Sequence, residues 1–290
     1  MKKSYLLAGL SILFWSTIAT VSKLLLNSLS TFQVLCISSL FAFLFLFFVN
    51  LVKGNLKRIK TYGWKDLFFM PLIGLPGVFL YNLCLYAGTA RMLASQAFIV
   101  NYLWPIMSVI FACILLKEKM TVRKGIAIAL SFLGVIIVTG GGLLSEFQMD
   151  TVIGAAFCAS GAVCYGIFTA LNQKYRYDKL FSMMLTYGAT FLFTLLLCAF
   201  RGELFLPSPV VLLGLGWNGI FVMAVATTSW ALALESGKTA KISNLAYITP
   251  FLSLIWTRIF LKEEISPFSF LGLAVIITGI FIQLKETKKS

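Results

Sequence analysis

The residues with the clearest chemical capacity in this sequence are polar, aromatic and proline residues inside long apolar segments. The strings Val100-Asn-Tyr-Leu-Trp-Pro105 and Ala246-Tyr-Ile-Thr-Pro250 each combine aromatic rings, hydrogen-bonding groups and a proline. A proline within a helix lacks a backbone N–H and deprives the carbonyl four residues earlier of its partner. Here those carbonyls belong to Asn101 and Ala246, and a buried, hydrated cavity can supply other partners. We therefore predict hinges at Pro105 and Pro250, inside two helices that border such a cavity.

Side chains around these prolines can orient a small organic molecule. Amide and hydroxyl groups are costly when they face lipid, so those in apolar segments, Thr249 among them, should face the interior of the protein. Aromatic faces with a few polar groups are the usual lining of a small-molecule site. The candidate substrate-binding residues are Trp15, Ser16, Tyr81, Asn82, Asn101, Tyr102, Trp104, Tyr165, Trp230, Asn244 and Tyr247. Core or interfacial packing is the alternative for any single aromatic residue, and it is preferred for Trp64, Trp217 and Trp256.

Two basic residues, Lys23 and Arg258, stand near the ends of apolar segments. Their ordinary role is to extend a charged head to the membrane interface. The alternative is that one of them attracts a carboxylate on the substrate or pairs across a gate. A weaker effect of Lys23→Gln on uncharged than on carboxylated substrates would distinguish the substrate role.

Residue types that usually perform catalysis or hold metals are scarce within the apolar segments. The chain has no His, and its six Cys include no CxxC pair, so we expect neither a metal site nor a cofactor. All ten acidic residues lie at or near predicted loops, which leaves no carboxylate in the middle of a span to relay protons. We predict that the chain is not an enzyme, although a lipid-acting membrane enzyme and a receptor or scaffold remain the alternatives of another class.

The elements that carry these residues are predicted to be membrane-spanning helices. Hydrophobic residues make up 60% of the chain and charged residues only 12%, which excludes an ordinary soluble domain. Continuous apolar runs exclude a β-barrel. The expected fold is all-α and integral to the membrane, with ten spans at residues 5–25, 31–52, 67–87, 94–116, 125–141, 152–172, 181–200, 210–233, 242–261 and 268–284.

The basic residues predict the orientation. Most of the 24 Lys and Arg residues fall at the two termini and in the connections after the second, fourth, sixth and eighth spans. Because short basic loops stay cytoplasmic, we expect a multi-pass protein of the cell membrane with both termini in the cytoplasm. The net charge of +14 is thus a topology signal, and no nucleic-acid partner is expected.

An internal repeat divides the chain into halves. Tyr102-Leu-Trp-Pro105 aligns with Tyr247-Ile-Thr-Pro250 at a separation of 145 residues, and Leu116-Lys-Glu118 aligns with Leu261-Lys-Glu263 at the same separation. Five spans per half would place the second copy upside down in the membrane. Such inverted repeats are common in secondary transporters, where the substrate lies between the halves near the midplane.

The chain resembles the drug/metabolite transporter superfamily over nearly its whole length, in the EamA-type ten-helix group. Leu13-Phe-Trp-Ser-Thr17, Val100-Asn-Tyr-Leu-Trp-Pro105, Asn172-Gln-Lys-Tyr175 and Ala246-Tyr-Ile-Thr-Pro250 are similar to the aromatic amino-acid exporters of the YddG type. The resemblance implies two five-helix repeats, residues 1–145 and 146–290, and export of aromatic or other neutral amino acids. Other small metabolites and amphipathic drugs remain alternative substrates, and we expect a facilitative carrier that works as a monomer.

Overall fold

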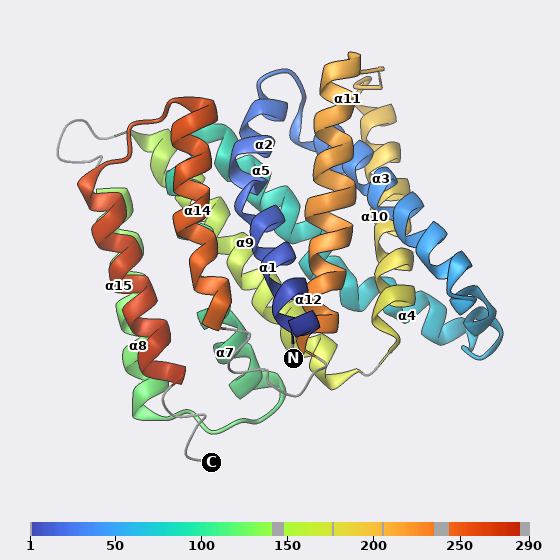
Figure 1. Cartoon of the computed structure of the whole chain (residues 1–290), viewed down its shortest axis with the longest axis horizontal. Helices are drawn as coiled ribbons and strands as arrows, with labels where there is room; N and C mark the ends of the chain where they lie inside the picture. The colour runs from blue at the N-terminus through green and yellow to red at the C-terminus, as the bar shows by residue number, and fades with distance from the viewer. Residues whose placement is uncertain (1, 141–147, 176, 205, 235–243, 285–290) are drawn as a thin grey trace.

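The computed structural model describes the chain except for residues 1, 141–147, 176, 205, 235–243 and 285–290. The described residues form helices packed side by side, with no strand among them (Figure 1). Eight helical segments of this part are long and apolar enough to cross a membrane: Lys3–Leu26, Thr31–Val52, Trp64–Arg91, Ala94–Leu115, Val122–Thr139, Met149–Lys174, Lys179–Phe200 and Pro209–Trp230. Two shorter apolar helices follow, Thr249–Leu261 and Pro267–Ile282.

These segments are divided into shorter elements because several helices change type or break along their length. In chain order the elements are α1 (Lys2–Ser16), α2 (Ile18–Leu26), α3 (Thr31–Val52), η1 (Asn55–Lys60), α4 (Trp64–Leu75), η2 (Pro76–Leu80), α5 (Tyr81–Arg91), α6 (Ala94–Asn101), α7 (Trp104–Leu115), α8 (Val122–Gly140), α9 (Met149–Lys174), α10 (Lys179–Phe200), α11 (Pro209–Gly216), η3 (Trp217–Ala226), α12 (Thr227–Leu234), η4 (Asn244–Ile248), α14 (Thr249–Trp256), η5 (Thr257–Leu261) and α15 (Pro267–Leu284).

The eight long segments overlap the first eight predicted spans, and the two shorter helices coincide with the ninth and tenth. The observed ends differ by a few residues, as in the third span, which runs over Trp64–Arg91 where 67–87 was expected. Length and composition therefore identify eight spans in the described chain, and the full set of ten remains a prediction.

The two predicted proline hinges differ from expectation. Instead of kinking continuous helices, Pro105 and Pro250 lie in the first turns of new helices, α7 and α14. Tyr102 and Leu103 form a turn between α6 and α7, and the 3-10 helix η4 precedes α14. The first turn of a helix has no intrahelical partner for its N–H groups, so a proline is tolerated there at little cost.

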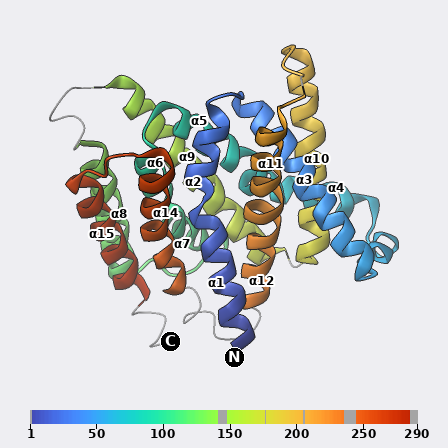
Figure 2. The same ribbon diagram turned by 45° about the horizontal axis from the view of Figure 1, so that its top comes forward.

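Small residues allow close approach of neighbouring helices. In Figures 1 and 2, α8 lies beside α15 at one edge of the bundle, and α3 lies beside α10 toward the other edge. A Cβ atom added at Gly134 of α8 would come within 2.6 Å of the carbonyl oxygen of Gly272 in α15. Without a hydrophobic force between helices in lipid, such close packing is a main source of helix association.

The bundle has two distinct ends. Helix α1 begins and α15 ends on the same side (Figure 2). Because each long segment crosses the bundle, α9 ends and α10 begins on that side too, whereas α2 and α5 end on the opposite side (Figure 1). We call the first side the open end and the second side the closed end.

Candidate functional site

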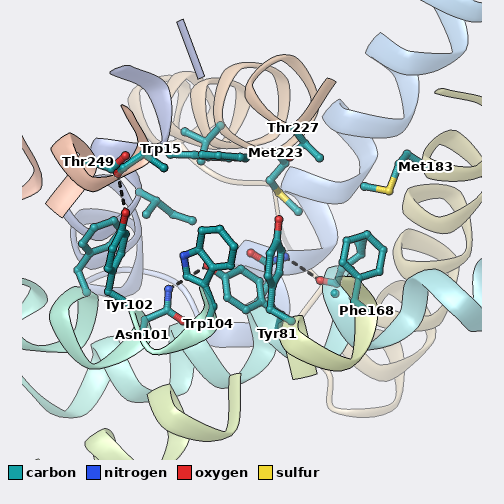
Figure 3. A pocket seen from close by; sticks show the side chains of 18 of the residues that line it. Trp15, Tyr81, Asn101, Tyr102, Trp104, Phe168, Met183, Met223, Thr227 and Thr249 are labelled. Atoms are coloured by element: carbon teal, nitrogen blue, oxygen red, sulfur yellow. Dashed lines mark hydrogen bonds between the residues drawn. The ribbon is translucent and has the colours of Figure 1, made fainter. Parts of the chain in front are cut away.

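A small pocket lies in the middle of the bundle, where segments from both halves of the chain meet. Its cavity volume is about 70 Å³, room for roughly two water molecules. Figure 3 shows Tyr81, Asn101, Tyr102 and Trp104 along one side of it, and Trp15, Met223 and Thr227 on the facing side. The lining also includes Ile18, Gly77, Val78, Asn82, Phe98, Tyr165, Phe168, Met183, Tyr187, Val222, Ala246 and Thr249.

A much larger cavity, which we call the vestibule, lies beside this inner pocket. Its volume is about 750 Å³, within the range of ~300–1,000 Å³ that small-molecule sites occupy. Both cavities are lined by Trp104, Tyr165, Phe168, Met183, Tyr187, Met223 and Thr227, so the two spaces adjoin each other. The vestibule extends along Leu46, Asn172, Asp178 and Thr228, which lie near the end of α3, the end of α9, the start of α10 and in α12. It therefore runs toward the open end.

Aromatic rings in contact with one another line the region where the two cavities meet. The Tyr165 ring centroid lies 4.9 Å from that of Tyr81 and 5.2 Å from that of Trp104, the latter pair edge to face. On the facing side, the rings of Trp15 and Trp230 are 5.4 Å apart. Aromatic pairs at such distances add stability beyond the area they bury.

Two polar atoms of the inner pocket have no partner within the described structure. The Asn101 side-chain nitrogen donates a hydrogen bond to the Tyr81 hydroxyl over 3.0 Å. The Asn101 carbonyl oxygen Oδ1 and the Thr249 hydroxyl are buried and unpaired among the described residues. Because unpaired buried polar atoms are rare, these two atoms, both in the pocket lining, are candidates for contact with a ligand.

The prolines and the pocket are connected through Tyr102. Its hydroxyl donates a hydrogen bond to the backbone carbonyl of Ala246 over 2.5 Å. That carbonyl is the one deprived of its helical partner by Pro250, so the predicted need for another donor is met by a side chain from the other half. This bond ties the turn between α6 and α7 to η4.

The other candidate residues are placed less centrally or differently. Asn82 lines the inner pocket, but its amide nitrogen bonds the Val78 carbonyl of its own helix over 2.7 Å. Trp230 lines the vestibule only. Ser16 lines neither cavity: it is fully buried and accepts a hydrogen bond from the Trp256 indole over 2.9 Å. Trp256 thus packs between helices, as preferred from the sequence.

Some predicted residues cannot be placed in the pocket. The side chains of Asn244 and Tyr247 lie outside the described residues, although both positions belong to η4. Lys23 and Arg258 are described, and neither lines the two cavities. The Lys23 ammonium instead donates to the carbonyls of Thr89 and Met92 over 2.7 and 2.8 Å, at the closed end.

Sequence reasoning missed several lining residues: Phe168, Met183, Tyr187, Met223 and Thr227. Tyr187 was the most accessible to prediction, because it follows Thr186 in a span that carries further hydroxyls. Met223 and Thr227 lie at the transition from the π-helix η3 to α12. A uniformly apolar run gives no signal of such a change in helix type, although π-helical segments are frequent at functional sites.

The lining of the inner pocket combines aromatic rings with neutral polar groups, which suits it to binding a small molecule. Among the described residues, those that line the inner pocket include no Asp, Glu, Lys or Arg. In the described part of the chain, no three His, Cys, Asp or Glu side chains are grouped in a way that could hold a metal ion. An aromatic cavity with a few neutral polar groups, entered from one end of a membrane-spanning helical bundle, is characteristic of a solute carrier.

Comparison with known proteins agrees with this class. The model of the EamA-like transporter family matches residues 2–140 and 152–284. The chain belongs to the EamA-like transporter family, and it is a multi-pass membrane transporter.

Similar proteins are also described as transport proteins, and one of them has a described substrate class. A protein of Archaeoglobus fulgidus described as an uncharacterized transporter is 28% identical over 98% of this chain and 99% of its own length. A probable terminal-alkyne amino-acid exporter of Streptantibioticus cattleyicolor is 26% identical over 77% of this chain and 75% of its own. A crystal structure with 19% identity matches the fold over 100% of both chains with a TM-score of 0.69.

Proposed function

We propose that this protein exports amino acids with aromatic or other neutral side chains from the cell. The observation that carries the proposal is the uncharged aromatic pocket, which holds two unpaired polar atoms and adjoins the vestibule at one end. The similarity to a probable amino-acid exporter supports the substrate class.

Polar groups of the pocket would bind the backbone part of an amino acid, and aromatic groups would bind its side chain. The unpaired Asn101 Oδ1 and the Thr249 hydroxyl can accept hydrogen bonds from a substrate ammonium group. The faces of Trp104 and Tyr165 can stack on an aromatic side chain. Because the inner pocket holds only about 70 Å³, such a substrate would occupy it together with the adjoining part of the vestibule.

The proposed architecture has ten spans in two inverted five-helix repeats, residues 1–145 and 146–290. Two backbone features support the repeat. Among described residues other than glycine, only Lys117 and Lys262 have positive φ angles, 59° and 55°, and they stand 145 positions apart. In both turns the following glutamate N–H bonds the carbonyl six residues earlier, Ala112 for Glu118 and Thr257 for Glu263, each at 3.4 Å. The same turn thus occurs at matching positions in both halves of the chain.

The proposed cycle is alternating access by a facilitative monomer in the cell membrane. The positive-inside pattern supports a cytoplasmic position for the termini and the open end of this structure, so the vestibule would receive solute from inside. With no carboxylate in the inner pocket lining, the solute gradient is the proposed driving force. A steep dependence of transport on an imposed pH gradient in liposomes would contradict this mechanism.

Binding of labelled tryptophan to the purified protein tests the substrate site. We expect Asn101→Ala to weaken binding by about tenfold or more, because a hydrogen bond to a charged group contributes roughly 1.5–3 kcal/mol. Trp64→Ala is the matched control, since the Trp64 side chain is 85% exposed and far from both cavity linings; its binding should equal that of the parent.

Two outcomes count against the proposal. Equal binding by the parent and a folded Asn101→Ala variant would remove Asn101 from the site. Absence of binding of any aromatic or neutral amino acid to the parent would end the amino-acid proposal and favour other metabolites or amphipathic drugs.

A further inference from the structure

A buried carboxylate at the closed end of the bundle has no role in the site described above. Glu263 follows η5 and is only 8% exposed, although its sequence position predicts a loop. Its two carboxylate oxygens accept hydrogen bonds from the backbone N–H groups of Ala94 and Ser95, over 2.7 and 2.9 Å. Those N–H groups open helix α6, so one carboxylate caps a helix that lies 169 and 168 residues away in sequence.

Two basic side chains hold the same junction together. Lys23, which is attracted electrostatically to Glu263, bonds the Thr89 and Met92 carbonyls at the end of α5. Arg258 donates to the backbone carbonyl of Glu263 over 3.2 Å. The ends of α2, α5 and η5 and the start of α6 are therefore joined at one place, which we call the closed-end junction.

The closed-end junction lies opposite the vestibule. The vestibule follows the end of α9 and the start of α10, whereas the junction lies at the ends of α2 and α5 (Figure 1). The connected segments come from both halves of the chain: Ala94 and Ser95 belong to the first half, and Glu263 to the second. A conformational change that moves the two halves of the chain apart at the closed end separates these segments.

We propose that Glu263 is the latch that keeps the closed end shut while the vestibule is open. The inference rests on the alternating-access part of the proposed function. A carboxylate bonded to two N–H groups at a helix start gains from charge-assisted hydrogen bonds and from the helix dipole. Both gains apply to the closed arrangement only, because separation of the halves exposes the carboxylate and the N–H groups to water. Glu263 therefore biases the equilibrium toward the state seen here.

The counterpart of Glu263 in the other half shows the opposite state. Glu118 follows the matching left-handed residue Lys117, and the two turns share the same backbone hydrogen bond. The Glu118 side chain is 50% exposed and pairs with Lys124 of α8 over 3.1 Å. Thus the same turn presents an engaged carboxylate at the closed end and a solvent-exposed one after α7, which ends at the open end.

The experiment measures how fast a charged, water-soluble maleimide labels a single introduced cysteine in detergent-purified protein. Ser95→Cys reports on the closed end, because Ser95 is 1% exposed and its backbone N–H is retained. Thr228→Cys reports on the vestibule. Each reporter is combined with Glu263→Gln or with Glu264→Gln, which removes the same charge from the exposed neighbouring residue. Protein without either reporter gives the background from the six native cysteines.

With Glu263→Gln we expect labelling at Ser95→Cys to rise by about tenfold or more, and labelling at Thr228→Cys to fall. Glu264→Gln should leave both rates within about twofold of the reporters alone. Unchanged labelling at Ser95→Cys would overturn the latch. A rise at both reporters would also overturn it, because general loosening raises both rates whereas alternation moves them in opposite directions.

This readout needs no substrate, so it is independent of the substrate proposal. Reciprocal labelling in a protein that binds no amino acid would keep the latch and reject the substrate. Tryptophan binding without any change in labelling would keep the substrate and reject the latch.

Discussion

One hydroxyl group joins the two proline-bearing segments of the chain. Tyr102 donates to the Ala246 carbonyl, which Pro250 has left without a helical donor. Both groups are buried, Tyr102 to 2% and Ala246 to 5% exposure. The bond therefore satisfies a buried backbone carbonyl at the edge of the inner pocket, and it does so across the two halves of the chain.

Tyr102→Phe should destabilise the protein by about 1–3 kcal/mol, because it leaves a buried carbonyl unpaired while the ring is retained. Thermal unfolding in detergent measures the effect. Tyr5→Phe is the control, since Tyr5 is 40% exposed and no hydrogen bond of its hydroxyl is described. A Tm of Tyr102→Phe equal to that of the parent would show that water or another donor serves the Ala246 carbonyl.

Glu203 links the stability of the fold to pH. Glu203 accepts hydrogen bonds from Ser30 and from Arg201, and these two partners lower its pKa below the ordinary value. A carboxyl group whose pKa is lower in the folded state stabilises the fold above its unfolded pKa, and this contribution disappears as the pH falls through the folded pKa. The contribution is small, because exposed ion pairs are screened by solvent.

Glu203→Gln mimics the protonated carboxyl group, so its Tm should lie below that of the parent at pH 7. The difference should shrink as the pH falls below about 4.5, the reference pKa of the carboxyl group. Paired unfolding curves at pH 7 and at acid pH make the comparison. A difference that is constant with pH would mean that Glu203 acts through shape and not through charge.

The paired helices α8 and α15 depend on the absence of side chains at two glycines. A Cβ at Gly134 would approach the Gly272 carbonyl oxygen to 2.6 Å and the Ile276 side chain to 2.5 Å. A backbone atom cannot move aside as the end of a flexible side chain can, so the helices must separate.

Gly134→Ala should therefore destabilise the protein by about 1–3 kcal/mol, as measured by thermal unfolding. Gly125→Ala in the same helix has nothing within 4 Å of the added Cβ, so it should be neutral or stabilise by up to about 1 kcal/mol. If both variants unfold at the parent's temperature, α8 and α15 are not packed as closely as described.

The sequence sufficed for the helices and for much of the pocket, for identifiable reasons. Hydrocarbon thickness imposes a length on apolar segments, which is why the expected spans overlap the observed helices. Trp15, Tyr81, Asn101 and Trp104 combine aromatic or polar character with an apolar context, and the structure brings them to one cavity.

Other features depend on contacts that sequence spacing does not encode. Trp15 and Ser16 are neighbours in the sequence, but their side chains point in different directions from α1. Trp15 lines the pocket, whereas Ser16 contacts Trp256. Whether a proline kinks a helix or starts a new one depends on the turn before it, here at Tyr102 and Leu103. Glu263 lies in a loop, as expected, but its burial could not be predicted, because nothing in the local sequence shows that its carboxylate contacts the start of α6.

The whole molecule is asymmetric in a way that its repeated sequence is not. The vestibule opens at one end, while the closed-end junction of Lys23, Arg258 and Glu263 closes the other. Under the proposed alternating access, this asymmetry corresponds to one of two states, because exchange of the arrangements between the proposed repeats would open the other end.

A counterflow experiment tests the proposed export of amino acids most directly. Proteoliposomes are loaded with unlabelled tryptophan, diluted into labelled tryptophan, and compared with liposomes that lack the protein. We expect transient accumulation of label through exchange, with much less accumulation by the Asn101→Ala variant. Uptake no greater than that of protein-free liposomes, for tryptophan and for every other neutral amino acid tried, would contradict the proposed export of amino acids.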